Sequence, residues 1–398
     1  MKKQKILQVH NYYQIPGGED TVVANEKRLL EENGHQVIQY TRHNSELKNQ
    51  TALQKLLLPF STIFHLRTYW EIKQKIREEQ IDVVHVHNTL NLISPSVYYA
   101  ALSCKVPVVQ TLHNFRMLCP CGTFYRDGHI CEDCLEKGLG CAVRYKCYRG
   151  SRVQTLGIVS STLFHRWTGI YRKIHFICLT EFNREKLLML NRGRRKPLID
   201  AKKTYIKPNF AFSSSSVAQK TAGSYYLFVG RMEEIKGIDL LLEAFSRLPE
   251  VELHVAGSGK EEYEQYLQEK DLPNIKLLGF LNREQMKREY VGAKALVVTS
   301  QWYEGFPMVI TEAFSNGVPV IAGNMGNSGD LVEEGITGIH FQYNDANDLI
   351  RAVRRFEQMD TRSMRENAYQ KYTDYLSHSA NYQILQDVYT SVQEKSET

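Results

Sequence analysis

The feature that most constrains the fold of this 398-residue chain is an alternation of strands and helices that occurs twice. Short stretches rich in β-branched and aromatic residues alternate with stretches of helical period. The strand-like stretches are 5–10, 36–40, 81–87, 106–113 and 175–180 in the first series and 225–229, 251–256, 274–278, 295–299 and 318–322 in the second. This alternation predicts parallel sheets with helices on both faces. The expected class is therefore α/β, with two doubly wound, Rossmann-like domains.

A segment that breaks the alternation separates the two series. Lys207-Pro208-Asn209 interrupts the pattern, and the Ser- and Thr-rich residues after it, 213–216 and 221–224, predict a flexible joint. The apolar stretch 50–66 fits either a helix or a strand, whereas 362–394 has a helical period with a stripe of tyrosines. We therefore expect an N-terminal domain over 1–206, a C-terminal domain over 207–375 and a terminal helix over 376–398.

Charge is distributed unevenly along the chain. Residues 1–205 carry 31 Lys and Arg against 17 Asp and Glu, and the remainder carries 19 against 27, so the net charge of +6 combines +14 with −8. Chance clustering on solvated faces is one interpretation, and contact with an anionic surface is the other. The sequence has no helix-turn-helix, zinc-finger repeat or RNP motif. Nucleic acid is therefore not an expected partner, and an anionic membrane surface is favoured.

The sequence does not predict membrane insertion. It contains no apolar run of 18 residues, and the apolar run near the N-terminus is too short for a signal peptide. We therefore expect a cytoplasmic chain that associates peripherally with the cytosolic face of a membrane.

One motif of the second series has the composition of a phosphate site. Residues 230–237 (GRMEEIKG) follow a strand and precede a helix. Ligands of doubly wound sheets bind at such turns, and two cations beside a helix N-terminus, Arg231 and Lys236, suit a diphosphate. The alternative is a pair of solvated side chains on a turn.

A second motif has the composition of a sugar site. Residues 303–307 (YEGFP) follow a strand, and Pro307 is a favoured first residue of a helix. Glu304 and Glu312 lie eight positions apart, and carboxylates around a helix start can accept hydrogen bonds from sugar hydroxyls. The alternatives are a charge that complements the helix dipole for Glu304 and a solvated helix face for Glu312.

Taken in order, these motifs resemble those of the retaining glycosyltransferases of the GT-B fold, in the group-1 (family four) class. The resemblance rests on Gly230-Arg231, Lys236-Gly237 and the Glu-x7-Glu frame of Glu304 and Glu312. Similar motifs continue along the chain, namely Gly17-Gly18, 83–87 (VVHVH), Thr111-Leu112-His113, 255–259 (VAGSG), 323–327 (GNMGN) and 335–338 (GITG). The resemblance implies two domains that face a cleft and a C-terminal helix that crosses back to the first domain.

The resemblance implies that a nucleotide-diphosphate sugar binds mainly to the C-terminal domain. Arg231 and Lys236 match the cations that neutralise the diphosphate, and Glu304 matches the glutamate that faces the donor sugar. Glu312 matches the glutamate that binds the ribose hydroxyls. The other implied donor-binding residues are Gly257, Gly259, Phe280, Gly305, Phe306 and Pro307. Because fixed cations stabilise the leaving phosphate, no catalytic metal is expected.

In the first half, two residues match family positions. Gly18 matches a glycine-rich loop that approaches the diphosphate, and His113 matches a histidine at a strand end that reaches the donor sugar. From its position alone, His113 would be a strand-terminal residue bonded to the backbone. His85 and His87 alternate with valines on a strand and are expected to be structural or to line the pocket.

The implied reaction moves a sugar from a nucleotide-diphosphate donor to a saccharide or lipid-linked saccharide acceptor, with retention at the anomeric carbon, in cell-surface polysaccharide biosynthesis. In the family, attack occurs on the same face and the leaving phosphate helps to deprotonate the acceptor. No carboxylate nucleophile for a double displacement is identifiable. Two alternatives remain open: a nucleotide-sugar 2-epimerase of the same fold, and a non-catalytic nucleotide- or carbohydrate-binding partner.

Residues 114–150 break the first series and hold six of the eight cysteines. Cys131 and Cys134 form a CxxC pair, and Cys119 and Cys147 flank it at similar distances. Four thiolates with one close pair suit a structural Zn²⁺ site. Cys121 and Cys141 are additional, and packed thiols or, less compatibly with a reducing cytosol, disulfides are the alternatives. The cysteine-rich segment is also present in a sub-branch of the family that this chain resembles.

Overall fold

The computed structural model describes residues 3–14, 17–49, 60–212, 223–259, 261–270 and 272–397. The chain divides into two compact units, which are described separately. Unit 1 comprises 1–124, 131–208 and 382–398, and unit 2 comprises 125–130 and 209–381. Within the expected joint, 213–216 and 221–222 lie outside the described residues, as do 50–59 of the ambiguous apolar stretch.

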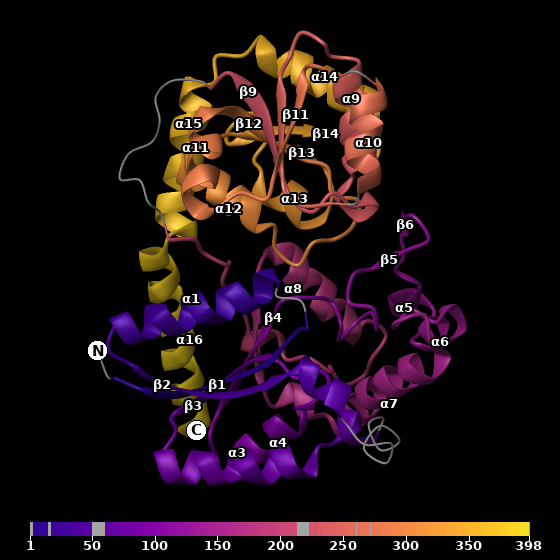
Figure 1. Cartoon of the computed structure of the whole chain (residues 1–398). Coiled ribbons are helices and arrows are strands. Elements are labelled where there is room, and N and C mark those ends of the chain that lie inside the picture. The colour runs from indigo at the N-terminus through magenta and orange to yellow at the C-terminus, as the bar shows by residue number, and fades with distance from the viewer. Residues whose placement is uncertain are drawn as a thin grey trace. The chain divides into compact units, whose positions relative to one another are not determined.

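Unit 1 is built on a six-stranded sheet whose paired strands all run parallel (Figure 1). Its order is β2-β1-β3-β4-β7-β8. The strands are β1 (Lys5–Tyr12), β2 (Gln36–His43), β3 (Val83–Asn88), β4 (Val108–Leu112), β7 (His175–Cys178) and β8 (Thr204–Ile206). The main helices are α1 (Gly18–Glu32), α3 (Leu66–Glu79), α4 (Ser96–Ser103), α7 (Arg152–Thr168), α8 (Glu181–Leu188) and α16 (His378–Glu397).

The last helix of the chain completes the core of unit 1. Side chains of α16 pack with Leu30 of α1 and with one face of the sheet, formed by Ile6, Val83, Val109 and Ile177. The α16 side chains in this apolar core are Leu385, Val388, Tyr389 and Val392. The expectation that a C-terminal helix belongs to the first domain is confirmed. The helical stretch from Arg362 is not continuous, since α15 (Arg362–Lys371) and a π-helical turn (Tyr372–Leu376) precede α16.

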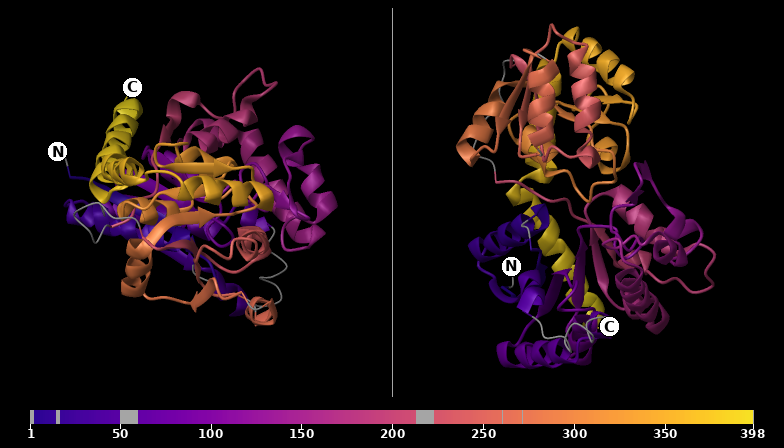
Figure 2. Two further views of the ribbon diagram at one scale, coloured as in Figure 1. Left: turned by 90° about the horizontal axis from the view of Figure 1, so that it is seen from above. Right: turned by 45° about the vertical axis from the view of Figure 1, so that its right-hand side comes forward.

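Unit 2 has a second six-stranded parallel sheet, in the order β11-β10-β9-β12-β13-β14. Its strands are β9 (Tyr225–Val229), β10 (Leu253–Ala256), β11 (Ile275–Gly279), β12 (Ala293–Val298), β13 (Val320–Gly323) and β14 (Gly338–Phe341). Helices cover both faces, with α9 (Ile238–Ser246), α10 (Glu261–Lys270) and α14 (Ala346–Glu357) on one side and α11 (Arg283–Gly292), α12 (Met308–Ser315) and α15 on the other (Figures 1 and 2).

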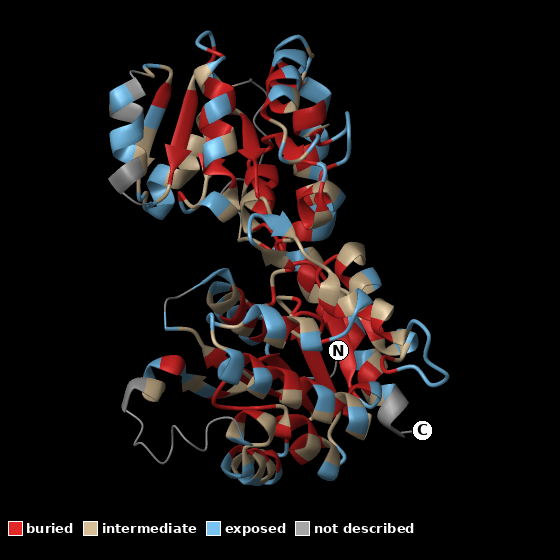
Figure 3. Cartoon of the chain, turned by 90° about the vertical axis from the view of Figure 1, so that its right-hand side faces the viewer, coloured by how far each residue is buried: buried red, intermediate tan, exposed pale blue. Residues whose placement is uncertain are grey.

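The burial pattern explains why the strand stretches were recognisable. Most strand residues of both sheets are buried, whereas the surface helices expose one face (Figure 3). A strand covered on both faces needs a nearly continuous apolar run, and this requirement produces the pattern in the sequence. All ten predicted strands are present, so the α/β class with two doubly wound, Rossmann-like sheets is confirmed. The short strands β8 and β14 and the long helix α7 were not predicted.

The cysteine-rich segment contains little regular structure. A two-stranded antiparallel pair, β5 (Tyr125–Arg126) with β6 (His129–Ile130), precedes two short helices, α5 (Asp133–Glu136) and α6 (Gly140–Tyr145). The segment then packs on α7, where Cys134, Leu139, Ala142 and Val159 form a small apolar cluster.

Truncation of Leu385 tests the contribution of α16 to unit 1. This side chain is fully buried, so Leu385→Ala should lower the free energy of unfolding by about 2–5 kcal/mol through lost burial and a residual cavity. Asp387→Ala, on the exposed face of the same helix, should change it by less than about 0.5 kcal/mol. Guanidinium titrations followed by circular dichroism measure both. Equal effects of the two variants would mean that α16 does not hold the core of unit 1.

Candidate functional site

The candidate site in unit 2 is set by the order of its strands. All strands run parallel, so all carboxyl ends lie at one edge of the sheet. The chain order reverses between β9 and β12, which are neighbours in the sheet although β10 and β11 separate them in sequence. Ligands of such sheets bind outside the carboxyl ends at this switch point. The loops that follow β9 and β12 are 230–237 and 299–307, the two motifs singled out in the sequence.

Glycines allow these loops to pack closely. A Cβ at Gly257, whose φ is +147°, would lie 1.8 Å from the carbonyl oxygen of Gly230, and one at Gly237 would lie 2.0 Å from that of Thr299. A Cβ at Gly259 would lie 2.2 Å from the Cβ of Met232. No side chain fits at such distances. Gly257 and Gly259, predicted to lie under the nucleotide, are therefore required by the backbone itself.

An ion pair joins the two loops at the switch point. The Lys236 ammonium lies 2.9 Å from Oε1 of Glu304, and the hydroxyl of Ser300 donates to the same carboxylate oxygen. The Lys236 side chain is 20% exposed and that of Glu304 11%. The Lys236 ammonium also lies 5.7 Å from the centre of the Trp302 ring. Lys236 and Glu304 are 68 positions apart in the sequence, where each was singled out separately. The structure brings the two side chains into direct contact.

The backbone of the second loop is held by Asn327. Its amide nitrogen donates to the carbonyl oxygens of Glu304 and, at 2.8 Å, of Gly305. Phe306 and Pro307 are buried, and Pro307 is the N-cap of α12, which begins at Met308. The first N–H groups of a helix have no intrahelical partner, so this end of α12 presents donors beside the Lys236–Glu304 pair.

Glu312 lies on α12 and contacts Tyr290 of α11. The Tyr290 hydroxyl donates to Oε2 of Glu312 at 2.8 Å. Burial raises the pKa of Glu312, and the hydrogen bond from Tyr290 offsets only part of this rise. Burial, followed by the charge of Glu312, also raises the pKa of Tyr290 well above its ordinary value, so the phenol stays a donor. Glu312 is therefore held in place rather than lying on a solvated helix face.

Two predicted donor residues lie at the surface of unit 2. The Arg231 guanidinium pairs with Glu233 at 2.9 Å, and its side chain is 63% exposed. Phe280 follows β11 and is 85% exposed. An aromatic ring this exposed at the carboxyl edge of the sheet is available to stack on a planar group.

In unit 1, His113 follows β4 and contacts a second histidine. Its Nε2 lies 2.9 Å from Nδ1 of His87, and the two rings are stacked. Burial lowers the pKa of His87 to about 4 and, with the charge of His87, lowers that of His113 well below its ordinary value. Both rings are therefore neutral near pH 7. Both line a cavity of about 100 Å³ within unit 1.

Gly18 begins α1. The residue after it, Glu19, was not singled out from the sequence. A Cβ at Gly18 would meet nothing within 4 Å, so packing within unit 1 does not require glycine there. Burial raises the pKa of Glu19 to about 7, although Arg116 and the Tyr13 hydroxyl, which donates at 3.0 Å, both lower it. Its place directly after the Gly17-Gly18 pair was the available signal.

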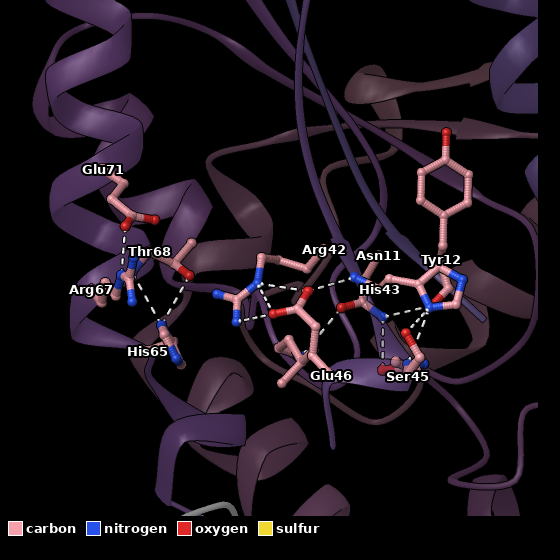
Figure 4. Close-up of polar contacts among 12 residues, drawn as sticks. Asn11, Tyr12, Arg42, His43, Ser45, Glu46, His65, Arg67, Thr68 and Glu71 are labelled. Carbon is pink, nitrogen blue, oxygen red and sulfur yellow. Dashed lines mark hydrogen bonds and ion pairs between the residues drawn. The ribbon is translucent and has the colours of Figure 1, made fainter. Parts of the chain in front are cut away.

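A second polar cluster lies at the end of β2 (Figure 4). Arg42 forms a fork with Glu46, with Nη2 2.7 Å from Oε2, and hydrogen bonds from Arg42 lower the pKa of Glu46. The amide of Asn11 donates to Asn44, and His43 contacts Ser45. These contacts stabilise the turn after β2.

Among the described residues, no three sulfur atoms of the four cysteines predicted to bind zinc lie within 4.8 Å of one another. Cys119 lies next to Cys121, with sulfur atoms 3.2 Å apart, and next to Cys134. The Cys121 contact lowers the pKa of the Cys119 thiol, but Cys134 and burial outweigh it and raise that pKa to about 11. Cys147 packs against the apolar cluster on α7, which contains Cys134. No disulfide links the eight cysteines, and zinc bound by Cys119, Cys131, Cys134 and Cys147 stays a prediction.

Comparisons with known proteins identify the class of the chain. Residues 211–371 match the family described as "Glycosyl transferases group 1", and residues 16–128 match "Glycosyltransferase Family 4". The chain is a glycosyltransferase of the GT-B fold. It is 24% identical to an uncharacterized glycosyltransferase of Methanocaldococcus jannaschii over 74% of this chain and 72% of that protein. The alignments with the next two curated relatives span 43% and 36% of their length.

Two solved structures share the fold of this glycosyltransferase along nearly its whole length. HepE of Anabaena, in complex with UDP, has a TM-score of 0.65 at 18% identity and covers 97% of this chain and 100% of its own. The lipopolysaccharide outer core galactosyltransferase WaaB has a TM-score of 0.63 at 15% identity, covering 97% of this chain and 99% of its own.

Replacement of Glu312 by glutamine tests the burial of its carboxyl. Because its pKa is raised, the native state binds the proton more tightly than the unfolded chain, in which glutamate titrates near about 4.3. Glu312 thus contributes stability below the unfolded pKa, and this contribution is lost as the pH rises through the native pKa. Glu312→Gln has no such loss. The unfolding free energy of Glu312→Gln minus that of wild type should therefore increase between about pH 4 and about pH 8. Urea titrations at several pH values measure this difference.

The control for this comparison is Glu366→Gln, which changes an exposed carboxylate on α15 and should show no such trend. If the unfolding free energy of Glu312→Gln instead fell relative to wild type as the pH rises, nearby cations rather than burial would determine the pKa of Glu312.

Proposed function

We propose that this glycosyltransferase moves a sugar, with retention at the anomeric carbon, from a nucleotide-diphosphate donor to a saccharide or lipid-linked saccharide. The observation that carries the proposal is the Lys236–Glu304 pair at the switch point of the unit 2 sheet. It places an ammonium for a diphosphate directly beside a carboxylate for sugar hydroxyls. Retention is proposed from the family resemblance of the motifs.

The surroundings of the pair support a nucleotide sugar as the donor. The N–H groups at the start of α12 suit phosphate oxygens, Glu312 suits ribose hydroxyls, and Phe280 suits a base. HepE, which shares the fold, is solved with UDP and with UDP-glucose. We propose a donor of the same class, a nucleoside diphosphate sugar, with Arg231 as a second cation for its phosphates.

The proposed reaction breaks the bond between the anomeric carbon and the β-phosphate oxygen and forms a bond from that carbon to the acceptor oxygen. The acceptor proton passes to the leaving phosphate. Negative charge develops on that phosphate as the bond breaks, and Lys236 stabilises it because its ammonium is already held in place by Glu304. Neutral His113 contacts the donor sugar in this proposal.

The proposed acceptor belongs to cell-surface polysaccharide biosynthesis. WaaB, which shares the fold, is a lipopolysaccharide outer core galactosyltransferase. Polar side chains line the cavity of unit 1, among them Asn88, Gln110 and Tyr98, which are hydrogen-bonded within unit 1. The alternative 2-epimerase would act on the donor without any acceptor.

Removal of either cation should reduce turnover more than stability. Loss of one preorganised contact to a developing anion costs about 3–4 kcal/mol, so Arg231→Ala and Lys236→Ala should each slow transfer roughly 100- to 1000-fold. Release of nucleoside diphosphate from UDP-sugars measures this, with thermal unfolding as the stability readout. Arg247→Ala, an exposed arginine that pairs with Glu243, is the matched control.

Wild-type rates in both cation variants would refute the diphosphate assignment. Interconversion of the sugar nucleotide without acceptor would establish the epimerase instead.

We also propose that unit 1 docks on an anionic membrane. Helix α7 buries one face in unit 1 but exposes large apolar side chains at helical spacing on the other: Val153 (71%), Leu156 (53%), Leu163 (50%) and Trp167 (82%). Such a face, with a tryptophan, suits the interface of a bilayer. In the described part of the chain, no helix has both the length and the hydropathy needed to cross a bilayer.

The docking face is tested by the double variant Leu156→Ser/Trp167→Ser. It removes apolar area from the proposed interface, so flotation with anionic liposomes at low salt should fall severalfold. Ile336→Ser, which changes an exposed apolar residue of unit 2, is the control and should float like wild type. Binding of wild type should also weaken with salt, because surface charges are screened. Undiminished flotation of the double variant would exclude α7 as the contact.

A further inference from the structure

The interior of unit 1 contains a carboxylate that the proposed reaction does not use. Glu26 lies in the middle of α1 and is completely buried. Its Oε1 is 3.0 Å from Nδ1 of His85 and 3.2 Å from Nε2 of His87, and its Oε2 is 3.1 Å from the ammonium of Lys207. Burial alone would raise the pKa of Glu26, but His85, Lys207 and His87 together lower it well below its ordinary value. Glu26 is therefore ionised and can only accept hydrogen bonds.

Metal binding is not the best explanation of this cluster. Among the described residues, only Glu26, His85 and His87 offer three ligand atoms within 4.8 Å of one another. However, the ammonium of Lys207 is completely buried against the same carboxylate and already supplies the positive charge that a cation would bring. The remaining ring nitrogen of His85 is 2.8 Å from Thr111 Oγ1. The chemistry of the cluster is that of an ion pair with histidine partners.

The cluster continues from Glu26 to His113 through His87. The Nε2 of His87 faces Glu26, and its Nδ1 faces Nε2 of His113 at 2.9 Å. Because burial lowers the pKa of His87 to about 4, this ring carries a single proton near pH 7. A lone pair on Nε2 would be repelled by the carboxylate, so the proton must be on Nε2. Nδ1 of His87 is then an acceptor, and the proton between the two histidines must belong to Nε2 of His113.

We propose that Glu26 is a positioning residue that holds His113, through His87, as the Nε2–H tautomer. His113 then keeps Nδ1 unprotonated, as a hydrogen-bond acceptor, and its ring orientation is fixed by the contact with His87. A neutral histidine that accepts a hydrogen bond suits a hydroxyl of the donor sugar. This role rests on the proposed function, in which His113 touches that sugar.

A purely structural role is a poor explanation of these buried charges. Burying an ion pair costs desolvation that the attraction often fails to repay, so such a pair is weak evidence of a stabilising role. Lys207 directly follows β8, and Tyr389 of α16 lies 2.7 Å from Nδ1 of His85, so several elements converge on Glu26. Together these elements keep the carboxylate of Glu26 ionised next to His87.

The first test measures the tautomer directly. Long-range ¹H–¹⁵N spectra of protein with ¹⁵N-labelled histidine distinguish protonated from unprotonated ring nitrogens, and His113→Gln assigns the signals of His113. Wild type should show His113 protonated on Nε2. In Glu26→Gln the new amide can donate to Nε2 of His87, which moves the proton of His87 to Nδ1 and that of His113 to Nδ1.

Because Glu26→Gln leaves Lys207 buried without its carboxylate, a second variant protects the experiment against unfolding. Glu26→Gln/Lys207→Met removes both charges together and should fold, while still changing the tautomer. Arg42→Met/Glu46→Gln removes the charged pair at the end of β2 (Figure 4) and should leave the spectrum of His113 unchanged.

The second test is turnover of the same variants. Misplacement of a contact group costs about 100-fold, so the folded Glu26 variants should lose about that much kcat with little change in KM for the donor, whereas the Arg42/Glu46 variant should keep both. An unchanged His113 tautomer in a folded Glu26 variant would overturn the proposal, and so would a changed tautomer with full kcat. Full activity of His113→Ala would refute the proposed contact between His113 and the donor sugar. The spectra separate this outcome from failure of the tautomer proposal, because they report the tautomer of His113 without any substrate.

Discussion

The close approach of the loops at the carboxyl edge of the unit 2 sheet is the constraint on which the proposed donor site depends. The backbone of Gly230 leaves no room for a side chain at Gly257, and Thr299 leaves none at Gly237. This packing positions the loops after β9 and β12 so that Lys236 reaches Glu304. In the proposed reaction the cation must be fixed before negative charge develops on the leaving diphosphate, and the Lys236–Glu304 pair would supply this preorganisation.

In unit 1, side chains are held in position around a buried charge. The carboxylate of Glu26 is ionised inside the core because Lys207 and two histidines surround it. These groups come from α1, β3 and the residue after β8, and α16 closes the same core with Leu385 and Tyr389. Helix α16 therefore contributes to the Glu26 cluster as well as to the stability of unit 1, because Tyr389 contacts His85 beside Glu26.

Much of this architecture was predictable from the sequence because parallel strands buried on both faces require apolar runs. Strands β8 and β14 were missed because they are only three and four residues long and lie at the edges of their sheets. Helix α7 was missed because it is apolar on two faces, one buried and one exposed, which weakens its amphipathic pattern.

The motifs of the proposed donor site could be singled out from the sequence because each lies within one short stretch of chain, whereas the Glu26 cluster joins residues from distant parts of the chain. One signal for it was available. Glu26 occupies the stripe of α1 that otherwise holds Val22, Val23, Leu29 and Leu30, and a charged residue on a buried stripe must find partners inside. The partners themselves, His85, His87 and Lys207, could be identified only once the sheet order was known. The same holds for the cysteines, whose spacing suggested four ligands but whose positions depend on how the segment packs on α7.

The most direct test of the central claim is a crystal structure of the chain with a nucleoside diphosphate, beginning with UDP. The account predicts that the phosphates bind at the switch point between β9 and β12, with oxygen atoms within hydrogen-bond distance of the Lys236 ammonium and of the first N–H groups of α12. Phosphates bound at any other edge of the sheet, or in unit 1 alone, would contradict it.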